Sequence, residues 1–458
     1  MSFTLIKAGV PAPLEVVIAG GGVAGPEALL ALHELAGRRV TVQLLAPERE
    51  FVYRPLAVAE PFGLAHPARI DLAAFAEQHG AHHRRESFAG VEPDRRILHT
   101  DSGRMMRFDA LLLAIGARPV EVVHGALTFR GPEDVGAFDR LLEELARGQV
   151  SSVAFASHER VRWPLPLYEL ALLSADHLAS LGVDGIDWKL VTHERMPLEI
   201  FGERASRTVA ELLEEAGIEI VTGRGPHMLK DGRLAFEDGG YVDVERVVAS
   251  PELRVPYLNG IPRGAGGFIP TDDLGRVKGL ERVFAAGDAT SFPIKQGGLA
   301  AQQADAAATA IAALAGVPVE PEPPDLLLRA ALLTGSAPQF LRVKLSEGET
   351  TSTAGRSVLW WPPGKIAAPH LAPYLAGRTE GGQPPPLDDV ETLLGEGAEA
   401  AEAQRTAALE LAYAAADADA GWADYDSALK WLEVAEKLNV TLPPTYARKR
   451  DEWSRALP

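Results

Sequence analysis

Three glycines near the N-terminus, Gly20, Gly22 and Gly25, have the spacing of a turn that binds the pyrophosphate of a dinucleotide. The first glycine of such a turn permits a tight bend, the second lets the pyrophosphate approach the backbone, and the third lets helix and strand pack closely. Val23 and Ala24 complete the turn and lead into a helix N-terminus that faces the phosphates. A purely structural glycine turn is the alternative interpretation.

The elements predicted around this turn are the ones that it needs. Residues 15–19 (EVVIA) predict a strand, residues 26–36 a helix and residues 40–45 (VTVQLL) a second strand, which together make a βαβ unit. A carboxylate that binds a ribose usually ends the second strand, but Ala46 occupies that position. Either the nearby Glu48 substitutes for it, or this hydrogen bond is absent.

Further along the chain, strands and helices keep alternating. Residues 108–115 (FDALLLAI) predict a strand buried on both faces, ending at Gly116. We interpret residues 1–149 and 256–316 as two parts of one domain, with a second α/β domain at 150–255 inserted between them. The predicted fold is therefore α/β, with two Rossmann-like dinucleotide-binding domains and an α-rich C-terminal region. The remaining predicted strands are 153–156, 188–192 and 282–286, and the remaining predicted helices are 168–181, 205–216 and 299–314.

Two proline-rich linkers, at residues 316–324 and 381–386, separate regions of different character. The region between them, 325–380, contains the cluster Trp360-Trp361-Pro362-Pro363, which suggests a packing interface. The tail, 387–458, is rich in Ala and Glu with helical spacing. It resembles the second half of one tetratricopeptide unit, which favours a docked helical hairpin over a free repeat array. The residues that carry this resemblance are Trp422, Tyr425, Ala428, Leu432 and Ala435.

Two later segments appear in the same order as in a known family. With the glycine turn, FDALLLAIGARP (108–119) and TDDLGRVKGLERVFAAGDAT (271–290) make the chain resemble the FAD-dependent pyridine nucleotide-disulfide oxidoreductase superfamily, over roughly residues 14 to 315. The resemblance implies FAD as cofactor, with Ala114 and Gly116 beside the flavin. It also implies that Asp288, next to Gly287, binds the ribitol or pyrophosphate side of FAD. Helix capping is the alternative for Asp288.

Within that superfamily, the segment KQGGLA resembles the one that presents a helix N-terminus to the pyrimidine edge of the flavin in sulfide:quinone oxidoreductases and type II NADH dehydrogenases. The resemblance implies that Gly297, Gly298 and Leu299 begin this helix. Its dipole and Lys295 would then stabilise negative charge on the reduced flavin and raise its potential. The alternative for Lys295 is a solvated side chain.

The loop FVYRPL (51–56) occupies the place that approaches the isoalloxazine ring in these families. The resemblance therefore makes Tyr53, Arg54 and Pro55 candidates for the wall of the flavin site. Ordinary packing in the core or at the surface is the alternative for Tyr53.

The second α/β domain departs from the family pattern. A nicotinamide-binding domain would have a glycine-rich turn after residues 153–156, but residues 157–170 are SHERVRWPLPLYEL. This segment resembles the one that carries a redox-active cysteine in flavocytochrome c sulfide dehydrogenase and sulfide:quinone oxidoreductase, and Trp163 stands at that place. A glycine-free turn cannot admit phosphate to the backbone in the usual way, which counts against the usual NADH site. Glu169 matches a glutamate near the nicotinamide face in related enzymes, or it is an ordinary first-turn helix glutamate.

Composition narrows the chemistry and the partners. The 458 residues exceed the roughly 250–300 residues of one hydrophobic core. Because the chain has no cysteine, thiolate catalysis, disulfides and Cys-ligated metals are excluded. The histidines show no ligand spacing, so no metal site is predicted. The net charge of -18 counts against nucleic-acid binding. No signal peptide and no transmembrane run of about 18 apolar residues are recognised, so we expect a cytoplasmic protein.

Our leading hypothesis is an FAD-dependent oxidoreductase that takes two electrons from NAD(P)H or another small-molecule electron donor and passes them to a quinone or protein electron acceptor. Tyr53, Trp163 and Glu169 would shape the donor pocket. The rival hypothesis is a flavoprotein that serves as a binding or assembly component without NAD(P)H activity. Weak peripheral membrane contact, best placed at Trp360 and Trp361, and a homodimer stay open, as does the covalent or non-covalent attachment of FAD.

Overall fold

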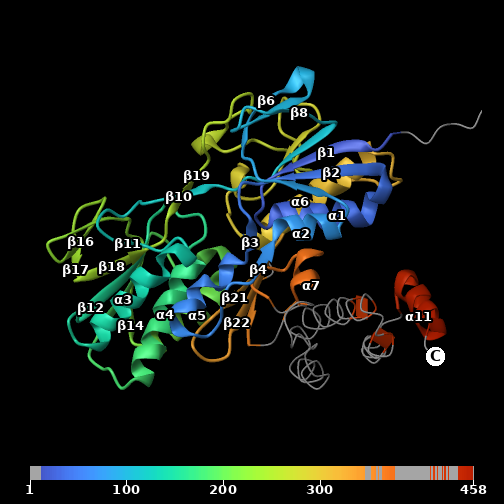
Figure 1. The fold of residues 1–458 in the computed structure, drawn as a ribbon. Coiled ribbons are helices and arrows are strands. Elements are labelled where there is room, and N and C mark those ends of the chain that lie inside the picture. The colour runs from blue at the N-terminus through green and yellow to red at the C-terminus, as the bar shows by residue number, and fades with distance from the viewer. Residues whose placement is uncertain are drawn as a thin grey trace, which may run out of the picture. The chain divides into compact units, whose positions relative to one another are not determined.

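The chain divides into two compact units, each built from three segments (Figure 1). The computed structural model describes residues 12–345, 352–356, 359–360, 364–376 and 442–456, with isolated positions between 413 and 432. Unit 1 comprises Met1–Tyr53, Ala68–Pro119 and Leu253–Pro324. Unit 2 comprises Arg54–Pro67, Val120–Glu252 and Asp325–Pro458. The domain boundaries expected from the sequence, at 149/150 and 255/256, stay predictions.

Unit 1 is centred on a parallel sheet with the strand order β20–β9–β1–β2–β5. Its inner strands are almost wholly apolar because both faces are covered. The strand predicted at 40–45 has those bounds, and β1 begins one residue earlier than predicted. The strands of this sheet are β1 (Leu14–Ala19), β2 (Val40–Leu45), β5 (His82–Arg84), β9 (Ala110–Leu113) and β20 (Val283–Ala285).

Helices and a small antiparallel sheet cover the two faces of the unit 1 sheet. Helices α1 (Ala24–Ala36) and α6 (Gly297–Leu314) pack against each other, side by side beneath β1 and β2 in Figure 1. On the other face, the meander β6–β7–β8 shares a hydrophobic core with the parallel sheet, including Val17, Leu98 and Leu111. The other elements of unit 1 are β3 (Glu50–Val52), β4 (Arg69–Asp71), α2 (Leu72–Gln78), β6 (Phe88–Glu92), β7 (Ile97–Thr100) and β8 (Met105–Arg107), with 3₁₀ helices at Gly37–Arg39, Pro93–Arg95, Ala265–Gly267 and Gly287–Ala289.

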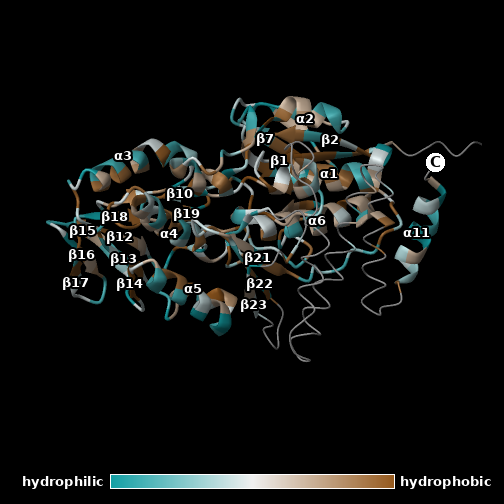
Figure 2. Cartoon of the chain, turned by 90° about the horizontal axis from the view of Figure 1, so that it is seen from below, coloured by the Kyte–Doolittle hydropathy of each residue, from teal (hydrophilic) through white to brown (hydrophobic). Residues whose placement is uncertain are grey.

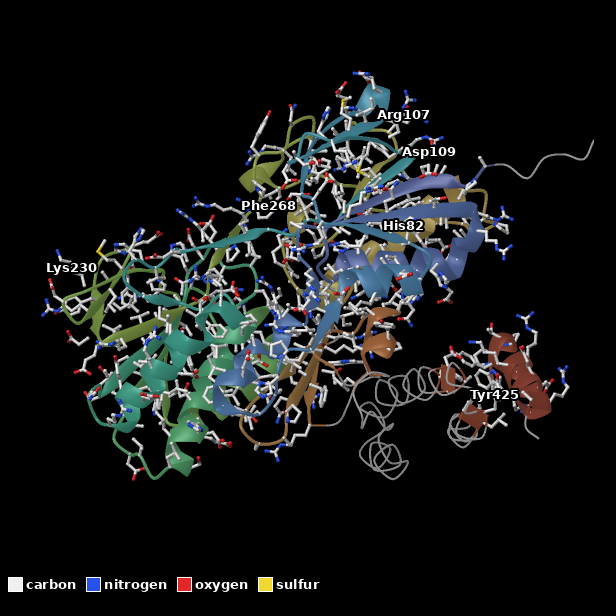
Figure 3. The ribbon with its side chains drawn as sticks, viewed as in Figure 1. His82, Arg107, Asp109, Lys230, Phe268 and Tyr425 are labelled. Atoms are coloured by element: carbon white, nitrogen blue, oxygen red, sulfur yellow. The ribbon has the colours of Figure 1, made fainter. Side chains whose placement is uncertain are left out.

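Unit 2 repeats this plan, with a parallel sheet in the order β11–β18–β12–β13–β14. A second antiparallel sheet, β15–β16–β17, packs against it through residues such as Ala154, Leu234 and Val247; Lys230, labelled in Figure 3, ends β15. Helix α5 carries both apolar and polar segments in Figure 2, as a helix with one face on a sheet does. The elements are η2 (Arg54–Phe62), β11 (Leu127–Thr128), η4 (Pro132–Asp134), α3 (Val135–Ala146), β12 (Ser152–Ser157), α4 (Leu165–Ser180), β13 (Asp187–Thr192), η5 (Glu199–Phe201), α5 (Glu203–Glu215), β14 (Ile218–Val221), β15 (Pro226–Lys230), β16 (Arg233–Phe236), β17 (Tyr241–Asp243) and β18 (Arg246–Ala249).

The two parallel sheets account for the predicted mixture of strands and helices. The chain passes from unit 1 to unit 2 within β10 (Arg118–Val120) and returns within β19 (Glu252–Arg254), and these two strands pair with each other. An α/β architecture with parallel, Rossmann-like sheets is thus confirmed.

The C-terminal region of unit 2 contains a three-stranded antiparallel sheet, β21 (Leu327–Leu332), β22 (Gln339–Lys344) and β23 (Ser352–Gly355). Helices α7 (Leu371–Ala376) and α11 (Pro444–Ala456) follow, and α11 is mostly polar in Figure 2. Most of the tetratricopeptide-like tail, including Trp422 and Ala435, lies outside the described residues.

Trp360 is not the exposed side chain that membrane contact would need. It is 5% exposed, packs edge-on against Phe340 with the ring centroids 5.1 Å apart, and donates its indole N–H to the Gly364 carbonyl at 3.0 Å. The prediction of membrane contact through Trp360 is therefore wrong, because a buried, hydrogen-bonded indole is already satisfied inside the protein. Trp361 lies outside the described residues.

Candidate functional site

The glycine turn of unit 1 links β1 to α1 and has no room for side chains at two of its three glycines. Gly20 has φ of +127°, and a Cβ built there would overlap the carbonyl oxygen of Ala114. A Cβ at Gly25 would overlap the carbonyl oxygen of Gly20. At Gly22, by contrast, nothing lies within 4 Å of a built Cβ. The turn is therefore tightly packed against the backbone at Gly20 and Gly25 and open at Gly22, which fits a pyrophosphate approaching the backbone there.

Helix α1 begins at Ala24, two residues before the predicted start. Val23 occupies the N-cap position without a side-chain hydrogen bond, so the first backbone N–H groups of the helix lack a capping side chain. The turn thus ends in a helix N-terminus of the kind that binds anions.

Glu48 lies on the surface beside this turn. Ala46, the usual position of the ribose carboxylate, is fully buried, whereas Glu48 is exposed. Its Oε2 atom lies 3.8 Å from a Cβ built at Gly21. The side chain of Glu48 thus reaches back over the turn, where it could accept hydrogen bonds from ribose hydroxyls.

Further candidate groups follow the carboxyl ends of β9, which pairs with β1, and of β20, which pairs with β9. Ala114 donates its N–H to the Ala19 carbonyl at 2.7 Å, and Gly116 adopts φ of +66°. Gly287 has φ of +80°, and its N–H donates to Gln303 Oε1 at 2.8 Å. A Cβ at Gly287 would lie 3.2 Å from the Ala300 Cβ, so this glycine allows the loop and α6 to pack closely.

Asp288 follows as a half-buried carboxylate. Burial raises the pKa of Asp288 above its ordinary value, and the positive charge of Lys295 opposes this shift. Since no described protein group donates a hydrogen bond to it, its oxygens are free to accept hydrogen bonds from ribitol hydroxyls. Helix capping is not its role in the described structure, because Gln296 caps α6 by accepting the Leu299 N–H at 2.9 Å.

Lys295 is buried rather than solvated, with 5% of the residue exposed. Its Nζ donates to the Thr290 carbonyl at 2.5 Å and lies 4.1 Å above the ring centroid of Phe268, which Figure 3 labels. Gly297 is the first residue of α6, and Gly298 and Leu299 are buried in its first turn. A fixed cation thus stands directly before a helix N-terminus, an arrangement that stabilises negative charge.

The loop that follows β3 contains the three residues predicted to line the flavin site, of which one is buried and two are more accessible. Tyr53 is 7% exposed, and its N–H donates to the Ala68 carbonyl at 2.9 Å. Arg54 is exposed and lies 3.7 Å from Glu133, while Pro55 is partly buried. A role for these three residues in the wall of a flavin site stays a prediction.

In unit 2, Trp163 and Glu169 lie at the start of α4. Trp163 is partly buried and meets Phe201 edge-on, with the ring centroids 6.0 Å apart. Glu169 is fully buried, and its Oε1 accepts both the Leu333 N–H at 2.9 Å and the Lys365 ammonium. Its Oε2 is buried without a hydrogen-bond partner. Glu169 is therefore not an ordinary solvated helix glutamate but one half of a buried ion pair.

Burial shifts both members of this pair toward neutrality. It raises the pKa of Glu169, against the charge of Lys365 and its hydrogen bond. It lowers the pKa of Lys365, against the charge of Glu169. Lys365 was missed in the sequence, where the only signal is a single lysine within the otherwise apolar run GKIAA.

A second buried network was also missed. Glu194, 5% exposed, accepts the Tyr168 hydroxyl at 2.6 Å and the Thr192 hydroxyl at 2.9 Å. Burial raises the pKa of Glu194, and these two hydrogen bonds oppose the rise. The available signal was position, because Glu194 follows β13, the second strand of a βαβ unit.

Within the described residues, no group of three or more His, Asp or Glu side chains is arranged to hold a metal ion. No helix in that part of the chain is long and apolar enough to cross a bilayer.

Comparison with known proteins agrees with this geometry. The fold is similar to that of the sulfide:quinone oxidoreductase from the hyperthermophilic bacterium Aquifex aeolicus, with a TM-score of 0.68 and 19% identity over 75% of this chain and 87% of that one. Residues 169–312 match the family model described as pyridine nucleotide-disulphide oxidoreductase.

Two relatives are similar in sequence. An "NADH dehydrogenase-like protein" of Mycobacterium tuberculosis is 27% identical over 291 residues, 60% of this chain and 72% of that protein. The ferredoxin reductase component of a chlorobenzene dioxygenase from Cupriavidus is 26% identical over 317 residues, 62% of this chain and 69% of that protein.

These matches fit the pyridine nucleotide-disulphide oxidoreductase superfamily that the sequence resembles, and the chain shares its fold with a solved structure. It is a flavin-dependent oxidoreductase with FAD as its cofactor, and the predictions of enzyme class and cofactor are confirmed.

Proposed function

We propose that this flavoenzyme takes two electrons from a small-molecule donor and passes them through FAD to a quinone or a protein acceptor. The observation that carries the proposal is the structure of unit 1, where an open glycine turn, an unpaired carboxylate and a buried lysine lie around the ends of one parallel sheet. Relatives support both acceptors, since one is a ferredoxin reductase component and a structural neighbour is a sulfide:quinone oxidoreductase.

Each group has a distinct part in this proposal. Gly20 and Gly25 shape the turn, and Gly22 leaves the space in which the pyrophosphate lies against backbone N–H groups. Asp288 accepts hydrogen bonds from the ribitol or pyrophosphate side of FAD. Lys295 and the start of α6 supply positive potential. When bound, FAD supplies the chemistry, because it accepts an electron pair from one partner and releases it to another.

We also propose a domain arrangement finer than the observed units. The FAD-binding domain would be formed by residues 1–149 and 256–316, with a second α/β domain at 150–255 inserted into it. Residues 325–380 would form an interface region, and residues 387–458 a helical tail. A homodimer is compatible with this arrangement.

The test is a half-reaction experiment with the purified, flavin-loaded chain. The flavin is photoreduced without oxygen and then mixed with a soluble quinone analogue or with an oxidised ferredoxin. Rapid return of the flavin absorbance with one acceptor is the expected result. If the reduced flavin persists with both acceptors, the flavin is structural and the assembly-component hypothesis takes the place of this proposal.

A lysine substitution tests the role of Lys295 in the same protein. Lys295→Met removes the buried cation and should lower the flavin midpoint potential by on the order of 30 mV, which for a two-electron couple corresponds to about 1.4 kcal/mol. Lys278, an exposed lysine in the same unit, provides the matched control. Lys278→Met should leave the potential unchanged, and equal potentials for both variants and the natural chain would refute the assigned role of Lys295.

A further inference from the structure

The chain contains two βαβ units of the same topology, and they differ where a dinucleotide would bind. In unit 1, β1 and β2 are parallel neighbours, and residues 20–23 link β1 to α1. In unit 2, β12 and β13 are parallel neighbours, and residues 158–164 link β12 to α4. Both links leave the carboxyl end of a strand, which is where α/β sheets bind ligands. The first link contains three glycines, whereas the second (HERVRWP) is longer and contains none.

The second link also has few backbone donors for a phosphate. Val161 donates its N–H to the His158 carbonyl at 2.9 Å, and Leu167 donates to the Pro164 carbonyl at 2.9 Å. Pro164 and Pro166 have no N–H to donate. The start of α1 also has a bonded N–H, from Gly25 to the Gly22 carbonyl, and a proline at position 26. The two helices differ at the N-cap, where Val23 of α1 has an N–H and Pro164 of α4 has none, so the start of α4 offers fewer N–H groups to a pyrophosphate.

The carboxylate expected to bind a ribose is also occupied. Glu194 lies just after β13, the place where a nicotinamide-binding unit carries its ribose carboxylate. Its Oε2 instead accepts the Tyr168 and Thr192 hydroxyls, and the Tyr168 oxygen in turn accepts the Leu198 N–H at 3.3 Å. Together with the burial of the residue, this network holds the Oε2 atom of Glu194 inside the protein, where it cannot bind a ribose hydroxyl.

The C-terminal sheet covers the same end of the unit 2 sheet. The 3₁₀ helix η5 follows β13, and its Phe201 is fully buried against Trp163. Ser352 of β23 donates its hydroxyl to the Phe201 carbonyl, and β22 contacts η5. Leu333, just after β21, donates to Glu169 near the start of α4. Figure 1 shows β21 and β22 beside α4 and α5, although more than a hundred residues separate them in sequence.

We infer that the second α/β unit does not bind NAD(P)H, although the family is named for pyridine nucleotides, and that it serves as the platform on which the C-terminal sheet is anchored. The residues present do not fit a nicotinamide dinucleotide at any of its three usual contacts: the glycine turn, the helix N-terminus and the ribose carboxylate. Resting on the proposed function, this inference narrows the donor to a small reductant that is not a nicotinamide dinucleotide.

Equilibrium dialysis of the flavin-loaded full-length chain against NADH, NADPH and NAD⁺ tests this inference. We expect no saturable binding up to about 1 mM, the upper end of the range in which enzymes usually use their substrates. FAD dialysed against the flavin-free chain serves as the positive control. Saturable binding of any of the three nucleotides below about 1 mM, or bleaching of the flavin by stoichiometric NADH or NADPH without oxygen, overturns the inference.

Hydrogen exchange locates any binding and needs no turnover. FAD should slow exchange in peptides that cover residues 20–25, whereas 1 mM NADH should change nothing in peptides that cover 157–170 and 193–202. Protection of either unit 2 segment by NADH contradicts the inference. Failure of the quinone and ferredoxin experiment would instead refute the proposed function and leave the dialysis result standing, so the two failures are distinguishable.

Discussion

The buried pair Glu169–Lys365 allows a quantitative prediction: removing either partner should destabilise the protein, and the stability of the two variants should change with pH in opposite directions. In Lys365→Met, Glu169 loses its cation and becomes neutral by taking up a proton in the folded state. In Glu169→Gln, Lys365 loses its anion and becomes neutral by releasing a proton. The Gln oxygen can still accept the Leu333 N–H, so in that variant the cost comes from the lysine. Each single variant should therefore be destabilised, but with its own dependence on pH.

Proton linkage sets the size of these effects. One pKa unit corresponds to about 1.36 kcal/mol, and the ordinary pKa values are about 4.3 for Glu and about 10.4 for Lys. Neutralisation at pH 7 then costs at most about 3.7 kcal/mol for Glu169 and about 4.6 kcal/mol for Lys365. Both values agree with the 3–5 kcal/mol typical of breaking a buried pair.

The sign of the pH dependence follows from which state binds more protons. In Lys365→Met the folded state carries the extra proton on Glu169, so stability falls as pH rises above about 4.3 and recovers on acidification. In Glu169→Gln the unfolded state carries the extra proton on Lys365, so stability rises with pH toward about 10.4. Each slope is at most about 1.4 kcal/mol per pH unit.

Thermal unfolding of the full-length chain at pH 5.5, 7 and 8.5 measures the pH dependence of stability in each variant. At pH 7 each single variant should lower the Tm of the unit 2 transition by on the order of 10 °C. The double variant should lose far less than the sum, since it leaves no unpaired charge. Glu203→Gln, which breaks the exposed Glu203–Arg207 pair on α5, is the control and should barely change the Tm. Parallel pH profiles for the two single variants, or additive losses in the double variant, would refute the reasoning.

Three further predictions concern single groups. Gly22→Ala should leave the fold intact but reduce the bound FAD, measured by absorbance, at least tenfold, because the new Cβ enters the open space at the turn. Gly136→Ala in α3, where a new Cβ is equally unobstructed, is the control and should retain full flavin. Equal flavin contents in the two variants would contradict the proposed site. Asp288→Asn should raise the Tm of the flavin-free chain at pH 7, because the raised pKa of Asp288 makes its ionised form unfavourable in the folded state. Below about pH 4 the carboxyl is protonated in both states, so the Tm should not change there. A lower Tm at pH 7 would contradict this reasoning. Tyr168→Phe removes one of two hydroxyl donors from Glu194 and should destabilise unit 2 by about 1–3 kcal/mol in thermal unfolding, whereas an unchanged Tm would mean that the network is not needed.

Local patterns were enough to predict the elements around the proposed flavin site. The strand at 40–45 and the helix ending at Ala36 have the predicted ends, because apolar runs and glycine punctuation are local signals. Helix α1 begins earlier than predicted because Gly25 belongs to the helix itself, and composition does not reveal where a turn becomes a helix. The open space at Gly22 supports the phosphate-binding interpretation of the turn.

Contacts between distant segments could not be predicted in the same way. Nothing in the order of residues indicates that Glu169 meets Lys365, or that Tyr168 bonds to Glu194, since such pairs depend on tertiary packing rather than periodicity. Trp360 was misjudged for a related reason. An aromatic residue beside prolines can lie on the surface or in a small core, and only the packing against Phe340 decides between them.

Unit 2 is assembled from segments that lie far apart in the sequence, and this affects how it folds during synthesis. Glu169 and Lys365 are 196 residues apart, so a ribosome adding about 5–20 residues per second needs roughly 10–40 s to make the second after the first. During that interval the α4 helix exists without the lysine that neutralises its buried glutamate, and until Gly355 has been added it also lacks the complete sheet β21–β22–β23. A nascent chain that stops before Lys365 should therefore hold unit 2 in a partly folded, chaperone-accessible state, while the strands and helices of unit 1 are already complete at Pro324.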